Sequence, residues 1–181
     1  MARLVGIGGS LRVGSYNLGL LRAAAGLMPE GSSLEVHSIR GVPLYDADEE
    51  EQSGIPTAVT TLKEALAKAD GLVLATPEYN NAMPGVLKNA IDWMSRPPAD
   101  SARVFAGKPV ALIGASPGGF GTILAQDSWL AVLRTLGTRP WFGRKHYVAR
   151  AGALFDADGN LTDEKARELL RGYLADFVAA L

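Results

Sequence analysis

The chain has 181 residues, which is enough for one α/β domain with a sizeable core. Its 18 Lys and Arg residues and 19 Asp and Glu residues leave a net charge of −1, which provides no electrostatic attraction for nucleic acid or an anionic membrane surface. The absence of cysteine excludes disulfides, iron–sulfur clusters and zinc–thiolate sites, and the two histidines are too far apart in the sequence to predict a metal site.

The sequence also predicts a cytoplasmic location. Residues 1–3 lead directly into an apolar segment and are too few to form the charged and apolar regions of a signal peptide. No apolar run approaches the ~20 residues that cross a bilayer as a helix. We therefore expect no membrane partner.

Short apolar runs predict the strands. Residues 4–7, 72–75 and 110–113 are continuously apolar, as in parallel strands that are covered on both faces. Residues 34–39 alternate between apolar and polar side chains, which predicts a less buried strand at the edge of the sheet. A last strand is expected within residues 141–148.

Helices are predicted between and after these strands. Residues 57–68 carry apolar side chains on one face, and residues 166–181 repeat an apolar residue every three or four positions. Thr162 is the expected N-cap of the last helix, with Asp163 and Glu164 in its first turn, where the helix dipole favours acidic side chains.

This alternation of strands and helices predicts the fold class. It indicates one domain over residues 1–181, an open, doubly wound parallel sheet of five strands with helices on both sides, in three α/β/α layers. In such a sheet ligands bind at the carboxyl ends of the strands. The loops that follow the strands are therefore the candidate sites.

The loop after the first strand, residues 8–17, has the composition of a phosphate site. It combines small residues with the hydroxyls of Ser10 and Ser15, the guanidinium of Arg12 and the amide of Asn17, directly before a helix. Backbone N–H groups at a helix start attract a phosphate, and these side chains donate hydrogen bonds to its oxygens. The alternative is a turn that only caps the first helix.

Two familiar nucleotide-binding loops do not match this segment. It lacks the Lys-Ser/Thr ending of the glycine-rich loop found in many nucleotide triphosphatases. It also lacks the third glycine of the dinucleotide fingerprint, because Leu11 stands in that position.

Two further loops follow apolar strands. Residues 76–85 include Pro77 and Pro84, which restrict the backbone, and a rigid loop of this kind suits a flat aromatic ligand. Residues 115–122 include three glycines, which let a ring or phosphate approach the backbone closely. Each loop alone is also compatible with an ordinary strand-to-helix connection, but their convergence on one rim indicates a common site.

The remaining polar residues do not assemble a catalytic group. Asp46 and residues 48–51 are expected to form a solvated acidic loop. His37 is expected to be an exposed strand residue, and His146 to belong to a surface cluster with the two basic residues before it. The sequence predicts no general base, nucleophile or carboxylate pair at the loop ends.

Four segments resemble the NADPH-dependent FMN reductase family, which includes chromate, quinone and azo-dye reductases. They are GSLRVGSYN at 9–17, PLYDAD at 43–48, TPEYNNAMPGVLKNAIDW at 76–93 and SPGG at 116–119, in the order and approximate spacing of the family. The resemblance covers nearly the whole chain. It implies a flavodoxin-like fold and an FMN-dependent NAD(P)H oxidoreductase.

The resemblance also implies which residues bind FMN. The phosphate would be held by Ser10, Arg12, Ser15, Tyr16 and Asn17. The isoalloxazine ring would be bordered by Pro77, Glu78, Tyr79 and Asn80, and its pyrimidine side by Ser116, Pro117, Gly118 and Gly119. No side chain is expected to be catalytic, because the flavin carries the chemistry.

The family implies a reaction and an assembly as well. NADPH or NADH would donate hydride in a ping-pong cycle, and a quinone, chromate, an azo compound or a similar small molecule would accept it. A homodimer or homotetramer is expected, with the helix at residues 85–95 near the subunit contact. The alternatives are a flavodoxin-type electron carrier without nicotinamide turnover and a non-redox nucleotide-binding domain.

Two departures from the family pattern affect these expectations. Asn81 stands where relatives often have an aromatic residue, which would widen or polarise the acceptor pocket. Residues 126–130 lack a Leu-Arg pair that many relatives have, so the resemblance does not carry over a tetramer contact or network that depends on that arginine.

Overall fold

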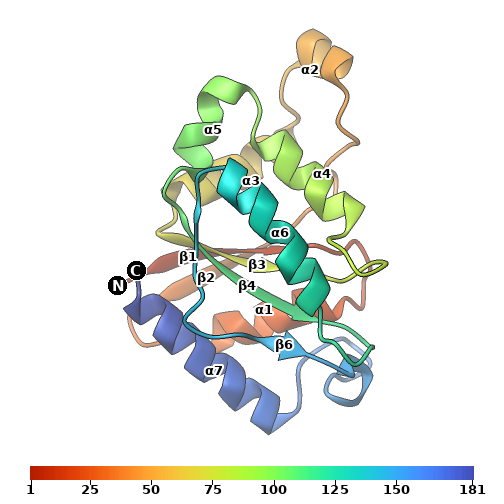
Figure 1. Cartoon of the computed structure of the whole chain (residues 1–181), viewed down its shortest axis with the longest axis vertical. Helices are drawn as coiled ribbons and strands as arrows, with labels where there is room; N and C mark the ends of the chain where they lie inside the picture. The colour runs from red at the N-terminus through yellow and green to blue at the C-terminus, as the bar shows by residue number, and fades with distance from the viewer.

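The computed structural model describes all residues, 1–181, as a parallel sheet between layers of helices (Figure 1). The strands follow the order β2-β1-β3-β4-β5, and every pairing is parallel. They are β1 (Arg3–Gly8), β2 (Ser33–Ser38), β3 (Gly71–Ala75), β4 (Pro109–Ala115) and β5 (Arg139–Pro140). A further short strand, β6 (Tyr147–Val148), pairs with the carboxyl end of β4. The predicted α/β fold class is confirmed.

Helices cover both faces of this sheet (Figure 1). One face carries α1 (Tyr16–Gly26) and α7 (Glu164–Ala179), and the other carries α3 (Thr57–Lys68), α4 (Gly85–Met94), α5 (Pro98–Phe105) and α6 (Ile123–Thr135). α2 (Ala47–Ser53) projects from the body, and a short 3-10 helix, η1 (Ala151–Ala153), follows β6. None of these helices is long and apolar enough to cross a membrane.

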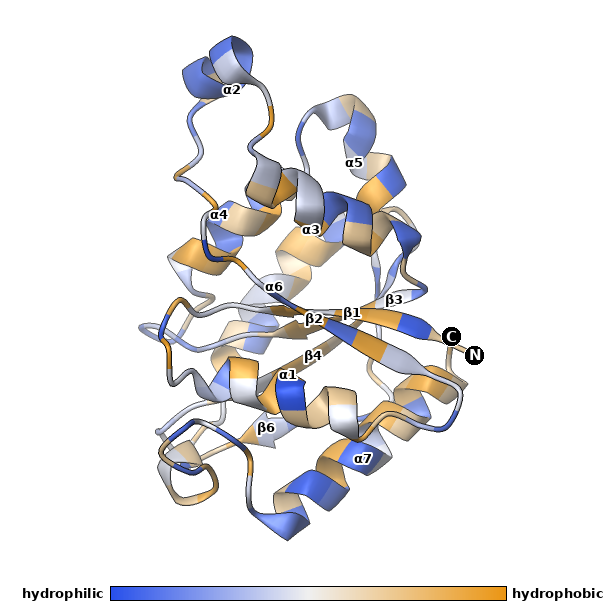
Figure 2. Ribbon diagram, turned by 180° about the vertical axis from the view of Figure 1, so that it is seen from behind, coloured by the Kyte–Doolittle hydropathy of each residue, from blue (hydrophilic) through white to orange (hydrophobic).

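Strand side chains alternate between two separate cores. On β1, Leu4 packs with α1 and α7, whereas Val5 and Ile7 pack with the helices of the opposite layer. On β3, Val73 and Leu72 divide in the same way. Burial on both faces is the reason that these strands appear in the sequence as continuous apolar runs. Figure 2 shows the apolar strands enclosed between helices whose polar sides face outward.

The expected last strand is divided in two. β5 pairs with the start of β4, and the chain returns to β4 only at β6. Between them the Trp141 ring packs against Tyr173 and Phe177 of α7, with ring centroids 5.0 and 5.3 Å apart. The backbone turns over this ring at Gly143, where a Cβ would lie 2.5 Å from the indole. Of the strand expected around residues 141–148, only Tyr147–Val148 pairs with the sheet, because packing of the half-buried Trp141 ring against α7 draws the chain away from it.

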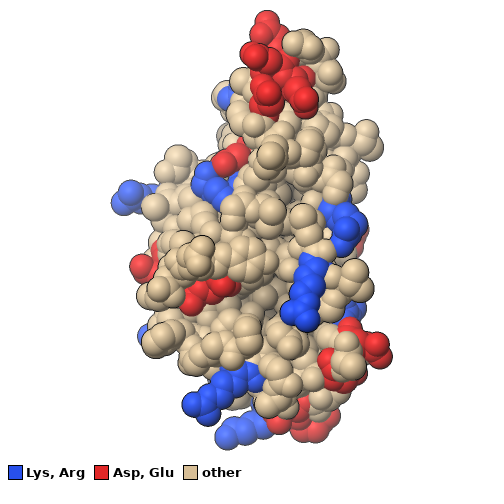
Figure 3. Space-filling view, turned by 90° about the vertical axis from the view of Figure 1, so that its right-hand side faces the viewer, with Lys and Arg blue, Asp and Glu red and all other residues tan.

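The acidic segment that was expected to be a loop forms α2. Asp46 is the N-cap and accepts a hydrogen bond from Asp48 N at 2.9 Å, and acidic residues fill the first turn, where the helix dipole favours them. Glu50 joins this helix to the body through Arg96 at 2.8 Å and the Tyr45 hydroxyl at 2.9 Å. The result is the acidic tip visible in Figure 3.

Two other helix starts differ from the expectation. The N-cap of α7 is Asp163, whose carboxylate accepts a hydrogen bond from Ala166 N at 2.8 Å, while the Thr162 hydroxyl donates to Leu154 O at 3.3 Å. The sequence patterns did not predict α5. This helix has Pro97 as its N-cap residue and begins with Pro98, and proline is favourable at the first position of a helix.

His146 is buried, so its expected place in a surface cluster is wrong. Its ring packs against Tyr173, with centroids 5.4 Å apart, and its Nε2 is shielded from solvent without a hydrogen-bond partner. Burial disfavours the protonated ring and lowers the pKa of His146 from 6.5 to about 4. His37, on β2, is half-buried rather than exposed.

Acidification should therefore destabilise the fold through His146. Because its pKa is lower in the folded chain, the unfolded chain binds more protons between pH 6.5 and about pH 4, and stability present above this range is lost as the pH falls through it. Denaturant unfolding at about pH 7 and about pH 4.5 should differ by roughly 2–3 kcal/mol from this group.

A matched pair of variants tests this assignment. His146→Gln should show a smaller loss of stability on acidification, whereas His37→Gln, the control, should behave like the native chain. The assignment of the effect to His146 is contradicted if His146→Gln loses as much stability as the native protein over the same pH range.

Candidate functional site

The loops after β1, β3 and β4 lie side by side, because these strands are adjacent in the sheet and end at the same edge. We call the first two the phosphate loop (residues 9–15) and the ring loop (76–84), after the parts of the ligand expected there. The third is the glycine loop (116–122), named after its glycines. Between them lies a hollow of about 110 Å³. Its lining comprises Ser10, Arg12, Ser15, Tyr16, Asn17, Pro77, Glu78, Tyr79, Ala115, Ser116 and Pro117.

The structure thus brings together predicted site residues from all three loops. Of the predicted set, Asn80, Gly118 and Gly119 do not line the hollow itself but lie one or two positions after residues that do. Ala115, the last residue of β4, lines the hollow and was not predicted.

The amino terminus of α1 presents free hydrogen-bond donors to the hollow. The Ser15 hydroxyl oxygen accepts from a backbone N–H of the first helical turn at 3.2 Å, and Ser10 Oγ accepts from Arg12 N at 3.3 Å. Both hydroxyl protons are left to donate to a ligand. The backbone N–H groups of Tyr16 and Asn17 have no acceptor within the chain and lie at the positive end of the helix dipole. This set of donors suits a phosphate.

Arg12 adds positive charge at the rim of the hollow. Its side chain is exposed, and the guanidinium carbon lies 5.8 Å from the centre of the Tyr16 ring. Arg40, just beyond β2, donates a hydrogen bond to the Leu11 carbonyl and so holds the backbone of the phosphate loop. The loop is therefore fixed by a different arginine, and the charge of Arg12 is available to a ligand.

The Asn17 side chain binds the chain itself. Its Nδ2 donates to Ala115 O and its Oδ1 accepts from Ala115 N, both at 2.9 Å. The residue is 4% exposed, and these two bonds join the start of α1 to the end of β4. The resemblance assigned this side chain to the phosphate. In the structure this amide bridges to Ala115 with one of its two N–H donors, and the unpaired backbone N–H of Asn17 is also open to a ligand.

Close packing holds the phosphate loop against the ring loop. A Cβ on Gly9 would lie 2.5 Å from a side-chain atom of Leu87 and 2.9 Å from the ring of Pro77. Only glycine fits at this position without displacing the first turn of α4 or the start of the ring loop. The glycine at the start of the phosphate loop therefore sets the distance between two parts of the site.

The ring loop contains a tight turn that presents Tyr79 at the surface. Tyr79 and Ala82 exchange backbone hydrogen bonds of 3.0 and 3.1 Å. Between them φ is 50° at Asn80 and 61° at Asn81, the pair of left-handed residues that a type I′ turn requires. Asparagine adopts this conformation more readily than an aromatic residue, which accounts for Asn81 here. Tyr79 is 49% exposed and offers an aromatic face beside the hollow.

The glycine loop leaves its outer side open. A Cβ on Gly119 would meet no atom within 4 Å, and one on Gly118 would meet only the Ser116 hydroxyl at 3.8 Å. The loop is held from the side of β6, where Ser116 N donates to Val148 O at 3.0 Å and Arg150 N donates to Gly118 O at 2.9 Å. The backbone N–H groups of Gly118 and Gly119 have no acceptor within the chain and remain available to a ligand.

The Glu78 side chain binds a helix instead of extending over the rim. Its Oε2 accepts hydrogen bonds from Leu124 N at 2.9 Å and from Ala125 N at 3.0 Å, in the first turn of α6. Thr122, at the N-cap position of α6, makes no side-chain cap, so Glu78 satisfies donors that a helix start leaves unpaired. The resemblance placed Glu78 at the flavin ring. In the structure its carboxylate is engaged by α6, and its backbone N–H has no acceptor within the chain.

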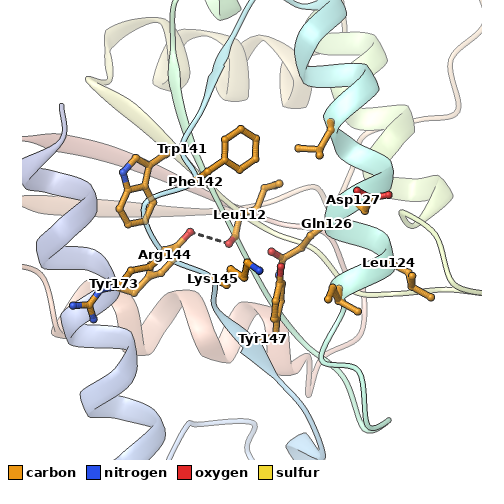
Figure 4. A pocket seen from close by; sticks show the side chains of 12 residues that line it. Leu112, Leu124, Gln126, Asp127, Trp141, Phe142, Arg144, Lys145, Tyr147 and Tyr173 are labelled. Carbon is orange, nitrogen blue, oxygen red and sulfur yellow. Dashed lines mark hydrogen bonds between the residues drawn. The ribbon is translucent and has the colours of Figure 1, made fainter.

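A larger cavity of about 420 Å³ lies between α6, α7 and the segment that joins β5 to β6 (Figure 4). Much of its wall is aromatic, with Trp141, Phe142, Tyr147 and Tyr173 around Leu112. Figure 4 shows the Tyr173 hydroxyl turned to Leu112 O, to which it donates at 2.9 Å.

We place the functional site at the smaller hollow, because several polar donors without partners converge there, whereas the larger cavity is mainly apolar.

Comparison with known proteins identifies the family. A family model described as NADPH-dependent FMN reductase matches residues 2–151. The chain belongs to this family. An NAD(P)H-dependent FMN reductase of Pseudomonas aeruginosa is 48% identical over 172 residues, which cover 95% of this chain and 91% of that protein. A 2-hydroxy-1,4-benzoquinone reductase of Burkholderia sp. is 40% identical over 171 residues, which cover 94% and 91% of the two chains.

Solved structures share the fold of this chain. A flavoenzyme NAD(P)H:(acceptor) oxidoreductase from Paracoccus denitrificans matches with a TM-score of 0.85 and 34% identity, over 99% of this chain and 96% of that chain. A flavodoxin from Bacillus cereus matches with a TM-score of 0.63 and 17% identity over 99% of each chain, which shows the fold alone. The predicted family, flavodoxin-like fold and enzyme class, an FMN-dependent NAD(P)H oxidoreductase, are confirmed.

Sequence reasoning missed the residues that hold the ring loop in place. Met83 N donates to Ser128 Oγ at 3.0 Å, and Trp129 Nε1 donates to Thr76 Oγ1 at 3.0 Å, so α6 binds both ends of this loop. One signal for these contacts was present. A buried tryptophan needs an acceptor for its N–H, and Thr76 is a polar residue directly after a buried strand.

Removal of the Asn17 amide should destabilise the fold. Asn17→Ala leaves the N–H and C=O of Ala115 unpaired in the interior, so the free energy of unfolding should fall by about 2–4 kcal/mol in denaturant unfolding of the flavin-free protein. Gln52→Ala, which removes an exposed amide from α2, is the control and should change stability by less than about 0.5 kcal/mol. A loss of the same small size in Asn17→Ala would contradict the bridging role.

Proposed function

We propose that the protein binds FMN at the hollow between the three loops and passes hydride from NADPH or NADH to a small electron acceptor, a quinone in the first place. The observation that carries this proposal is the set of donors without partners at the start of α1, which continues into two loops with free backbone N–H groups. Bound FMN supplies a ring that takes up hydride from a nicotinamide and passes on two electrons.

The phosphate end fits the residues at the start of α1. The hydroxyls of Ser10 and Ser15 and the N–H groups of Tyr16 and Asn17 supply hydrogen bonds, and the helix dipole adds positive potential. Arg12 contributes a charge-assisted bond from the rim. Glu78, the acidic residue of the lining, does not oppose an anion strongly, because two N–H groups of α6 bind its carboxylate.

The ring end fits the other two loops. Pro77, Glu78, Tyr79 and Asn80 offer a rigid edge with an aromatic face, and Ser116, Pro117, Gly118 and Gly119 offer an open backbone on the pyrimidine side. The N–H groups of Glu78, Asn80, Gly118 and Gly119 have no acceptor within the chain. Such fixed donors stabilise negative charge that develops on a bound ring during reduction.

The chain's own residues act by binding and orientation. No histidine lines the hollow, and the one carboxylate in the lining is committed to α6. We therefore propose no catalytic side chain. A single exposed face would serve the nicotinamide and the acceptor in turn, which is a ping-pong cycle. We also propose a homodimer or homotetramer, with α4 near the subunit contact.

A flavodoxin-type electron carrier is the competing function, and the charge distribution disfavours it. Such a carrier docks other proteins through a strongly acidic face, whereas the net charge here is −1. Figure 3, which views the carboxyl edge of the sheet, shows acidic side chains at the tip formed by α2 and in smaller groups elsewhere, separated by basic and uncharged residues, so this face is not continuously acidic. One relative is named a 2-hydroxy-1,4-benzoquinone reductase and another a quinone reductase, and these names support a small-molecule acceptor.

Spectroscopy and steady-state kinetics test this function. The purified protein with added FMN should show a bound-flavin spectrum, and anaerobic NADPH or NADH should bleach it. Initial rates at several concentrations of NADPH and benzoquinone should give parallel double-reciprocal lines. Flavin that binds but is not bleached by either nicotinamide would favour the electron carrier, and protein that binds no FMN would contradict the proposal.

Arg12 should strengthen FMN binding without being essential for the fold. Arg12→Ala should weaken binding about tenfold to a hundredfold, the effect of one lost hydrogen bond to a charged group, and Arg12→Lys should weaken it less. Arg134→Ala removes an exposed arginine at the far end of α6 and is the control. Fluorescence titration with FMN measures all four proteins. Equal affinity of the native protein and Arg12→Ala would contradict the role of Arg12.

A further inference from the structure

The ring loop is attached at three points to a single helix, α6. Trp129 Nε1 donates to Thr76 Oγ1 at the start of the loop, and Met83 N donates to Ser128 Oγ near its end, each at 3.0 Å. Between these two contacts, the Glu78 carboxylate accepts from two backbone N–H groups of the first turn of α6. All attachment points lie within residues 124–129, so the first two turns of α6 support the whole loop.

The Glu78 contact differs from the other two because it is charged and lies inside the site. A hydrogen bond to an ionised group is roughly twice as strong as a neutral one, and here a single oxygen accepts two. α6 has no N-cap of its own, since Thr122 has φ of 72° and its Oγ1 accepts from Gln126 Nε2 at 3.2 Å. Glu78, which lies 46 residues before Leu124, takes the place of the missing cap.

This contact joins the two loops that border the proposed flavin ring. α6 begins directly after the glycine loop, so a bond from Glu78 to its first turn sets the position of the ring loop relative to the glycine loop. The backbone N–H groups of Glu78 and Asn80 have no acceptor in the chain, and they belong to the segment that the Glu78 side chain joins to α6. Without the Glu78 bonds the loop would still form its turn at Asn80 and Asn81 and keep the contacts of its two ends with α6, but its middle would no longer be fixed against that helix.

We propose that Glu78 is a positioning residue for hydride transfer, which holds the ring loop against the first turn of α6 so that the two loops bordering the flavin ring keep a fixed separation. This inference rests on the proposed function. In this role Glu78 acts on α6 and the loop backbone, and its carboxylate does not contact the reacting atoms. The reach of the side chain, which brings an acceptor oxygen to the first turn of α6, should therefore matter more than the additional strength that its charge gives the two hydrogen bonds.

Three substitutions separate reach from charge. Glu78→Gln keeps the length and one acceptor oxygen, Glu78→Asp keeps the charge but is one methylene shorter, and Glu78→Ala keeps neither. Asp127→Ala removes a carboxylate of α6 that lies at the larger cavity, away from the ring loop, and is the control (Figure 4). All proteins are full-length and saturated with FMN.

Stopped-flow reduction by NADPH under anaerobic conditions gives the main measurement. We expect Glu78→Asp and Glu78→Ala to lower the limiting rate of flavin reduction about tenfold or more, with a much smaller change in the NADPH concentration at half-saturation. The midpoint potential of the bound flavin should become more negative, because the loop donors no longer face the ring. Glu78→Gln should restore most of the rate, and Asp127→Ala should match the native protein.

Hydrogen–deuterium exchange supplies a readout that does not depend on turnover. The amides of Leu124 and Ala125 should exchange faster in Glu78→Asp and Glu78→Ala than in the native protein or Glu78→Gln. If Glu78→Ala does not fold, Glu78→Asp carries the same comparison. The native rate and native potential in Glu78→Asp would overturn the proposal and leave Glu78 as a structural cap only.

Failure of the proposed function would look different. Native protein that binds no FMN, or whose FMN is not reduced by NADPH, contradicts the oxidoreductase function itself. In that case unchanged exchange of the Leu124 and Ala125 amides in Glu78→Asp would separately overturn the attachment of the ring loop to α6, whereas faster exchange would support the attachment alone.

Discussion

The bridge between Asn17 and Ala115 is the interaction on which the site depends. One buried amide satisfies both the N–H and the C=O of the residue at the end of β4, and thereby fixes the start of α1 relative to the centre of the sheet. A parallel sheet leaves the backbone groups at its carboxyl edge without partners in the next strand, and a buried group of this kind is costly if it stays unpaired. The amide removes this cost and also orients the first turn of α1 toward the hollow.

α6 provides the corresponding support on the other side of the hollow. It begins after the glycine loop and binds the ring loop through backbone N–H groups, Ser128 and Trp129. The two loops that border the proposed ring are thus organised by one rigid element. A rigid support of this kind gives a bound ligand fixed donors without reorganisation during the reaction, which is the property that electrostatic stabilisation requires.

The chemistry assigned to the site requires few side chains. Many of the unpaired donors in and beside the hollow are backbone N–H groups, and the hydroxyls of Ser10 and Ser15 act by donating hydrogen bonds. Backbone donors need particular turns more than particular side chains. This explains why the site is dense in glycine, proline and asparagine, and why its acidic side chain, Glu78, acts on a helix end.

The sequence by itself determined the order of strands and helices, the three loops and the family, because buried parallel strands leave continuous apolar runs and the loop segments are specific. It did not determine contacts between residues far apart in the chain. Asn17 and Glu78 appear in the sequence as ligand contacts, but the fold commits their side chains to Ala115 and to the first turn of α6. Local patterns likewise did not reveal that Trp141 divides the last strand or that His146 is buried. Only tertiary packing decides which neighbour satisfies a polar group or covers a ring, since that depends on distances the chain acquires on folding.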